Sequence, residues 1–328
     1  MSISDLPFRL DIPAAAEAIA PHIRRTPVLR VPDLVGPAAQ DVFFKLESLQ
    51  VTGSFKVRGA ANKMLGLGES DQKRGVIAFS TGNHGKAVAY VAGKTGIRAV
   101  VCLSEHVPVY RAEAIEKLGA EVALKGGSQD EAEANYQRLA KERGLVPVVP
   151  FDDPMIIAGQ GTIALEILDV LPDVDVLMIQ LSGGGLLAGI AVAAKSINPK
   201  IQVMGVSLTQ SPAMFESLKA GQPVTVEEKD SIADSLLGGI GIENRYSLPL
   251  IEKYVDAHLL VDEEEIKDAM FAVFAEHRLV VEGAGAVGVA ALLHRKMDVS
   301  GKKVAALLSG SSIDVAQYVR ILQSRLSE

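Results

Sequence analysis

The sequence has little of what several classes of protein require. Its 328 residues include one cysteine, Cys102, and no tryptophan. A single cysteine excludes an intramolecular disulfide framework and a cysteine-rich metal site, and it favours a reducing compartment, the cytoplasm. Basic residues are fewer than acidic ones, 33 against 40, for a net charge of -7, whereas nucleic-acid-binding proteins usually show a basic excess. The longest apolar stretch, residues 186–194, is about half of the roughly 18 to 20 residues that a membrane helix needs. We therefore expect no nucleic-acid partner and no membrane segment.

Short β-branched runs alternate with helical patterns from about Asp41 to the C-terminus, which predicts an α/β fold built from parallel βαβ units. The runs predict strands at residues 42–46, 76–80, 99–103, 121–124, 146–149, 176–181, 202–206, 259–261 and 304–308. The helical patterns fall at residues 14–23, 55–65, 84–93, 111–118, 131–143, 157–168, 187–196, 264–277, 286–294 and 313–325.

The strands between residues 76 and 149 form a compact block that ends near Pro147 and Pro150. We expect this block to be a smaller α/β domain, residues 69–150, inserted into a larger one. The larger domain then consists of residues 1–68 and 151–328.

The first candidate for chemistry is the segment KLESLQVTGSFKVRGA, residues 45–60. Thr52, Gly53 and Ser54 predict a turn with a hydroxyl N-cap, which places Lys56 in the first turn of a helix. The positive end of the helix dipole lowers the pKa of an amine there and favours the neutral nucleophile that forms a Schiff base with an aldehyde. A lysine in a first turn is more often a solvated surface group, so the segment alone leaves both interpretations open.

The second candidate is AFSTGNHGKAVAY, residues 78–90, in which an apolar strand leads through a hydroxyl-rich loop into a helix. Such a loop presents backbone N–H groups and hydroxyls that suit a carboxylate. A simple N-cap, with Asn83 in a left-handed turn, explains the pattern equally well.

The third candidate is VLMIQLSGGGLLAG, residues 176–189, where three glycines between a strand and a helix permit close approach to a phosphate. No GK[ST] sequence follows, which excludes a nucleoside-triphosphate loop. Gly183, Gly185 and Ala188 match a relaxed dinucleotide fingerprint, but residues 189–215 contain no acid to bind the ribose. A nicotinamide oxidoreductase is therefore disfavoured.

The fourth candidate is VAALLSGSSID, residues 304–314, an apolar strand that ends in hydroxyls before the last helix. Ser309 either caps that helix or offers a neutral hydroxyl to a ring nitrogen.

Together and in this order, the four segments resemble the serine/threonine dehydratase family of pyridoxal-phosphate enzymes, called fold type II, over about residues 14–322. STGNHGKAVAY, FDDPMIIAGQGT and VVEGAGAVG are most similar to the branch named hydroxyectoine-utilisation dehydratase. The resemblance implies a two-domain fold like that of the tryptophan synthase β chain, with parallel and mixed twisted sheets flanked by helices. It also implies pyridoxal phosphate as cofactor and a homo-oligomer, a dimer or a tetramer.

The resemblance implies a role for each candidate. Lys56, with Phe55 beside it, binds the cofactor aldehyde as a Schiff base, and Asn83 contacts the cofactor's phenolic oxygen. Ser309 faces the pyridine nitrogen, and Glu282 lies near the cofactor. The substrate carboxylate is held by Ser80, Thr81, Gly82, Asn83 and His84. The phosphate is held by Ser182, Gly183, Gly184, Gly185 and Leu186.

The implied activity is that of a lyase, which eliminates water from a β-hydroxy amino acid to give a keto acid and ammonia. The substrate is of the threonine or serine type, or a hydroxy diamino acid derived from hydroxyectoine. A serine racemase is the nearest alternative, but the loop residue that is a serine in those enzymes is Thr81 here.

Two departures from the family pattern affect specificity and metal binding. Lys86 replaces a common glutamine, which adds a positive charge near the substrate entrance and favours a substrate with an extra anionic or polar group. Metal-activated relatives have an acid where this chain has Ser207, and Ser211 and Ala213 occupy the other two liganding positions. Hard cations prefer carboxylate oxygens, so we expect no divalent metal site.

Overall fold

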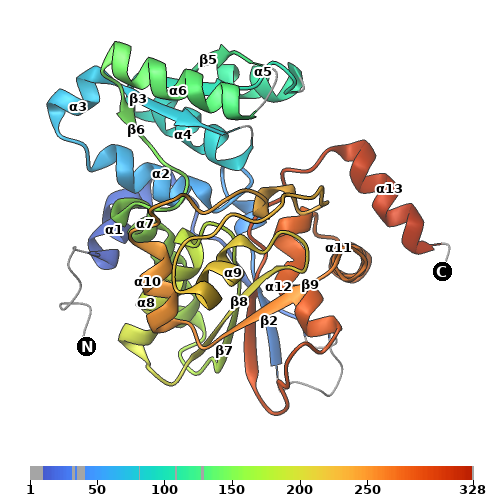
Figure 1. Cartoon of the computed structure of the whole chain (residues 1–328). Helices are drawn as coiled ribbons and strands as arrows, with labels where there is room; N and C mark the ends of the chain where they lie inside the picture. The colour runs from blue at the N-terminus through green and yellow to red at the C-terminus, as the bar shows by residue number, and fades with distance from the viewer. Residues whose placement is uncertain are drawn as a thin grey trace.

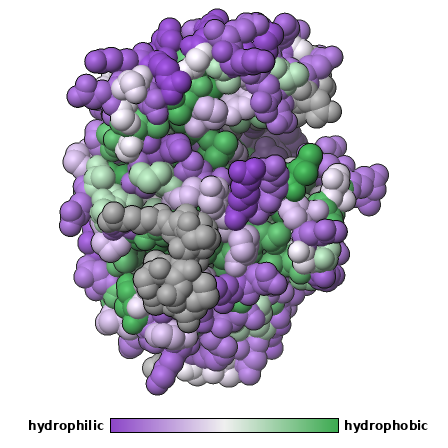
Figure 2. All heavy atoms as spheres, turned by 60° about the vertical axis from the view of Figure 1, so that its left-hand side comes forward, coloured by the Kyte–Doolittle hydropathy of each residue, from purple (hydrophilic) through white to green (hydrophobic). Residues whose placement is uncertain are grey.

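The computed structural model describes residues 10–31, 34, 41–80, 82–107, 109–126 and 129–326. Within these ranges the strands form two sheets flanked by helices (Figure 1), the mixed α/β architecture that the sequence predicts. Figure 2 shows mostly hydrophilic residues on one face, with hydrophobic side chains exposed in smaller areas. None of the helices in the described ranges is long and apolar enough to cross a membrane.

The larger sheet has the strand order β1-β2-β10-β7-β8-β9. Its strands are β1 (Val28–Arg30), β2 (Asp41–Lys45), β10 (Lys303–Leu307), β7 (Val176–Gln180), β8 (Gln202–Leu208) and β9 (Ala257–Val261). The β1–β2 pair is antiparallel and the other pairs are parallel. A parallel sheet is covered on both faces, and accordingly every residue of β7 is buried.

Helices form a layer on each face of the larger sheet. One layer contains α1 (Ile12–Ile19), α7 (Pro154–Val170), α8 (Gly185–Ile197) and α10 (Ser247–Tyr254), and the other contains α11 (Glu263–His277), α12 (Gly283–Leu293) and α13 (Val315–Leu326). Successive strand residues point to opposite faces. Leu177 and Ile179 therefore pack in the first layer, and Val176 and Met178 in the second.

The smaller sheet, at the top of Figure 1, has the order β5-β4-β3-β6 and is parallel throughout. It contains β5 (Glu121–Leu124), β4 (Ala99–Leu103), β3 (Val76–Phe79) and β6 (Val146–Pro147), with α3 (Glu69–Arg74), α4 (Asn83–Thr95), α5 (Val109–Lys117) and α6 (Gln129–Arg143). Val57 and Met64 of α2 (Lys56–Leu65) share the core of this sheet. Because α2 precedes residue 69 yet packs with the smaller sheet, the domain boundaries stay a prediction.

Several short elements are not predicted from the sequence: β1, α3, α10 and α9 (Ala213–Ala220). Two turns or fewer carry too little periodicity to identify a helix. The predicted hydroxyl cap of α2 is wrong, because Phe55 is the N-cap residue and no side chain caps this helix. The acidic run at residues 262–265 begins α11, where Asp262 and Glu265 form a capping box.

Candidate active site

Lys56 is the first residue of α2, and neighbouring segments fix its position. The backbone N–H of Phe55 donates to the Ser309 carbonyl at 3.0 Å. The Lys56 Nζ donates to the Pro150 carbonyl at 2.9 Å. Burial of the amine lowers the pKa of Lys56 to about 8, while the negative charge of Glu282 opposes this shift. Burial is therefore the main cause of an amine that is partly neutral near physiological pH.

Asn83 and Glu282 are in direct contact although they lie far apart in the sequence. The Asn83 Nδ2 donates to Glu282 Oε1 at 2.8 Å, and the backbone N–H of Ser312 donates to Glu282 Oε2 at 2.7 Å. Burial raises the pKa of Glu282 to about 7, against the effect of the Ser312 hydrogen bond. The Asn83 Oδ1 is buried without a hydrogen-bond partner among the described residues. An unpaired buried acceptor is costly, so this oxygen is positioned to accept a hydrogen bond from a bound group.

The loop between β3 and α4 contains the other predicted substrate-binding residues. Gly82 donates its N–H to Ser80 Oγ at 3.4 Å, and Thr81 lies outside the described residues. The His84 Nε2 is 2.7 Å from the Val148 carbonyl. Burial lowers the pKa of His84 to about 3, so the ring is neutral and its Nε2–H donates to this carbonyl. No side chain caps α4, so its first N–H groups are available to an anion.

The glycine-rich loop, residues 182–186, packs closely against the turn that follows β6. A Cβ on Gly183 would lie 2.3 Å from the Phe151 ring, and one on Gly185 would lie 2.5 Å from the Phe151 carbonyl. Gly184 has a φ of 93° and is the N-cap residue of α8, again without a side-chain cap. The sequence between Ser182 and Leu186 is thus glycine for steric reasons, and the loop presents free N–H groups at a helix N-terminus.

The turn at residues 150 and 151 connects the lysine to the glycine-rich loop. Pro150 accepts the hydrogen bond from Lys56, and Phe151 packs on Gly183 and Gly185. Segments that are far apart in the sequence therefore meet at one place, as the resemblance implies.

Ser309 lies between the lysine and the glutamate. It is buried, its carbonyl accepts from Phe55, and the carbonyl of Gly310 accepts from the Glu282 N–H at 3.1 Å. Capping of the last helix is not its role. That helix, α13, begins at Val315, and Asp314 Oδ1 accepts from the N–H of Gln317 at 2.9 Å.

Asp152 and Ser247 support the glycine-rich loop, and the sequence analysis did not identify either residue. The Asp152 carboxylate accepts from the N–H groups of Tyr246 and Ser247 at 2.9 and 2.8 Å. The Ser247 Oγ donates to the Gly183 carbonyl at 2.8 Å. The only sequence signal was the pair of aspartates in FDDP, directly after the last strand of the smaller sheet.

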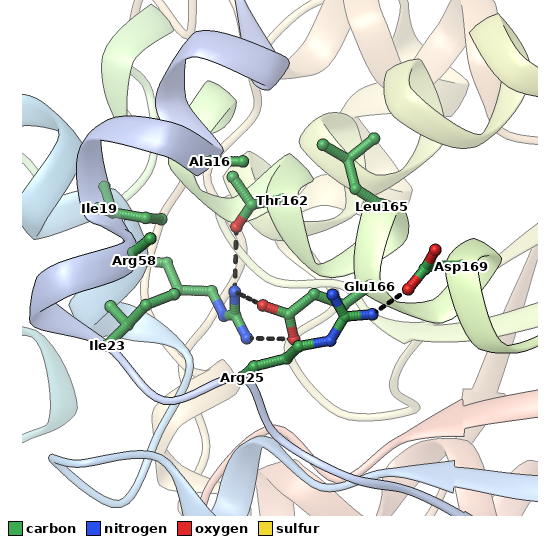
Figure 3. A pocket seen from close by; sticks show the side chains of 10 residues that line it. Ala16, Ile19, Ile23, Arg25, Arg58, Thr162, Leu165, Glu166 and Asp169 are labelled. Atoms are coloured by element: carbon green, nitrogen blue, oxygen red, sulfur yellow. Dashed lines mark hydrogen bonds and ion pairs between the residues drawn. The ribbon is translucent and has the colours of Figure 1, made fainter.

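A buried ionic network supports α2 two residues beyond Lys56. The Arg58 side chain is fully buried and donates to both Glu47 oxygens at 2.8 Å. It also donates to both Glu166 oxygens, at 2.7 and 2.9 Å, and to Thr162. Figure 3 shows the guanidinium directed at Thr162 and Glu166 beside a cavity of about 370 Å³. The network ties α2 to α7 and to the segment that follows β2.

This arrangement fits pyridoxal phosphate. Lys56 supplies an amine of lowered pKa for the aldehyde, and the buried Asn83 Oδ1 lacks a partner among the described residues. Gly183 to Gly185 form a cradle that a Cβ would fill. The fold and the site together define a pyridoxal-phosphate enzyme of fold type II.

Comparison with known proteins establishes the family. Residues 19–310 match the family model of pyridoxal-phosphate dependent enzymes, and the chain belongs to this family, within its serine/threonine dehydratase group. A relative from Thermotoga maritima, an L-threonine ammonia-lyase, is 43% identical over 96% of this chain and 78% of its own length.

Solved structures agree with this assignment. A bacterial threonine deaminase, from the organism abbreviated T.th., superposes with a TM-score of 0.85 at 36% identity, covering 94% of this chain and 99% of the other. Maize serine racemase superposes with a TM-score of 0.89 at 31% identity, covering 96% and 97%.

The expected absence of a divalent metal site is not decided by these comparisons. Ser207 is buried in β8, and Ser211 Oγ is engaged by the Glu227 carbonyl at 2.7 Å and the Lys229 N–H at 2.9 Å. In the described part of the chain, no three or more His, Cys, Asp or Glu side chains are grouped to hold a metal ion. Chelation of divalent cations in the assay tests this expectation directly.

Proposed function

We propose that this protein is a pyridoxal-phosphate-dependent ammonia-lyase that eliminates water from a β-hydroxy amino acid and releases a keto acid and ammonia. The observation that carries the proposal is the convergence of Lys56, Asn83 and the glycine-rich loop around the turn at residues 150 and 151. Threonine and serine are the first candidate substrates. The match of several segments to the hydroxyectoine-utilisation branch adds a hydroxy diamino acid to the list.

The residues that hold the cofactor follow from the site. Lys56 holds the aldehyde, with Phe55 beside it, and Ser182 to Leu186 hold the phosphate at the N-terminus of α8. Asn83 faces the phenolic oxygen and Ser309 the pyridine nitrogen. Glu282 contacts Asn83 at 2.8 Å and thereby fixes the orientation of its amide. When bound, the cofactor supplies a conjugated ring that stores the electron pair left when the Cα–H bond breaks.

The chain's own groups perform the binding and the proton transfer. The loop from Ser80 to His84 holds the substrate carboxylate at the N-terminus of α4, where backbone N–H groups favour an anion. The Lys56 amine removes the Cα proton, because its pKa of about 8 leaves a useful neutral fraction. Ser309 is a neutral hydroxyl and cannot protonate a ring nitrogen as a carboxylic acid would. A weaker electron sink favours prompt loss of the β-hydroxyl over transamination.

The direct test is keto-acid formation from a panel of β-hydroxy amino acids, together with an absorbance spectrum. The wild-type protein incubated with pyridoxal phosphate should develop the visible-edge band of a lysine-bound cofactor, and Lys56→Ala should lose both the band and the activity. Lys94→Ala, which alters an exposed lysine at the other end of α4, is the matched control and should keep both. A colourless wild-type protein would refute the proposal.

Serine racemase activity is the second candidate, and the structural similarity to the maize enzyme favours testing it. The measurement is the yield of D-serine from L-serine beside the yield of pyruvate. We expect pyruvate to dominate. D-serine as the main product would make the chain a racemase instead.

We further propose that residues 69–150 form a domain inserted between residues 1–68 and 151–328, and that the protein works in the cytoplasm as a dimer or tetramer. The sheet memberships support the inserted domain. The single buried cysteine supports a reducing compartment. Light scattering on the purified holoenzyme measures the oligomeric state, and a monomeric mass would contradict this part.

A further inference from the structure

Lys86 lies close to the candidate active site and has no role in the proposed reaction. It is three residues after Asn83 in α4, so the two side chains share one face of the helix. The Lys86 Nζ donates to Ser312 Oγ at 3.3 Å. The same serine donates its backbone N–H to Glu282 at 2.7 Å. The ammonium group is therefore one residue away from the buried carboxyl that contacts Asn83.

The Lys86 ammonium has few partners. An ammonium has three donors, yet among the described residues it forms the single long hydrogen bond to Ser312 and no ion pair within 4.0 Å. The side chain is partly buried, and this burial lowers the pKa of Lys86. A partly desolvated cation without an ion-pair partner is a favourable site for an anionic group of a ligand.

The charges around Lys86 do not neutralise it fully. Arg111 of α5 adds a second positive charge that further lowers the pKa of Lys86, and Arg111 is itself 3.9 Å from Asp234. Glu282 is the acid that acts on Lys86, and with a pKa of about 7 it is about half protonated at neutral pH. This part of the site therefore favours an added negative charge and disfavours an added ammonium group.

We propose that Lys86 is a specificity-determining residue that binds a carboxylate attached to the β-carbon of the substrate. The preferred substrates are then β-hydroxy amino dicarboxylates, of which β-hydroxyaspartate is the smallest. The inference rests on the proposed lyase function and narrows its substrate class. The bond changes are those of the parent reaction: the Cα–H and Cβ–O bonds break, water leaves, and water returns when the nitrogen is released as ammonia, so no other reactant is needed.

The experiment compares kcat/KM for the threo and erythro isomers of β-hydroxyaspartate with that for threonine, in the wild type and in Lys86→Gln. We expect wild type to prefer one hydroxyaspartate isomer. In Lys86→Gln its KM should rise about ten- to hundredfold, the usual effect of losing a charge-assisted hydrogen bond, while the threonine KM changes little. Lys86→Arg should keep most of the preference, and Lys94→Gln is the charge-matched control on the same helix.

A binding measurement separates recognition from chemistry. L-aspartate and L-alanine carry no β-hydroxyl to eliminate, so calorimetric titration of the holoenzyme reports their affinity alone. Aspartate should bind more tightly than alanine in the wild type, and Lys86→Gln should remove the difference. If threonine is preferred and Lys86→Gln leaves both ratios unchanged, the specificity proposal is wrong although the lyase function stands. If no β-hydroxy amino acid yields a keto acid, the lyase function itself fails.

Discussion

Replacing Glu282 by glutamine tests the electrostatics of the candidate site. The pKa of this buried carboxyl rises from an ordinary value of 4.5 to about 7, so the folded protein holds the proton more tightly than the unfolded chain. The stability that this proton confers is complete below pH 4.5 and is lost as the pH rises through 7. At 1.36 kcal/mol for each pKa unit, the full loss is about 3 kcal/mol, of which about 2.5 kcal/mol falls between pH 5 and pH 8.5.

The assay is urea denaturation of the cofactor-free protein at pH 5 and pH 8.5. Glutamine has no proton to lose, so from pH 5 to pH 8.5 Glu282→Gln should gain about 2.5 kcal/mol in free energy of unfolding relative to wild type. Comparing the two proteins at each pH cancels the titration of groups such as His84. Glu252→Gln, at an exposed position of α10, should change the difference by less than about 0.5 kcal/mol. An equal effect of Glu282→Gln at both pH values would show that burial does not raise this pKa.

Three further outcomes are expected. Gly183→Ala would bring a methyl group to 2.3 Å from the Phe151 ring, so it should weaken pyridoxal-phosphate binding, measured by absorbance titration, while Gly301→Ala at an open surface turn should not. Arg58→Met should lower the free energy of unfolding by about 3 to 5 kcal/mol, because it leaves the carboxylates of Glu47 and Glu166 without their partner; a loss under about 1 kcal/mol in urea denaturation would contradict this account. EDTA should leave keto-acid formation unchanged, and a loss restored by Mg²⁺ would reveal a divalent site after all.

Local patterns predict most of the fold, because parallel strands and their helices leave strong hydrophobic signals in the sequence. Nine of the strands are predicted close to their observed positions, and β1, with only three residues, is missed. The cap of α2 is predicted incorrectly for a related reason. Ser54 looks like a hydroxyl cap in the sequence, but a bridge to Gly310 fixes its backbone instead. A long-range contact of this kind has no local signature.

The residues of the site are predictable as types but not as partners. Lys56, Asn83 and the glycines follow from motif chemistry and the resemblance. The Pro150 carbonyl that accepts from Lys56, and the support of Gly183 by Ser247, depend on tertiary packing. Burial is also a tertiary property. The pKa of about 8 for Lys56 follows mainly from enclosure of the amine, which a sequence cannot express.

The position of the site between the two sheets explains why its polar contacts cross from one sheet to the other. Asn83 and Lys86 belong to a helix of the smaller sheet, whereas Glu282 and Ser312 lie in segments next to the larger one. The Asn83–Glu282 and Lys86–Ser312 hydrogen bonds therefore link the substrate loop to the part of the chain that holds the glycine-rich loop. A substrate carboxylate that takes Lys86 away from Ser312 would exchange one of these links for a contact of its own. Substrate charge and the relative position of the two sheets are thus coupled through one side chain.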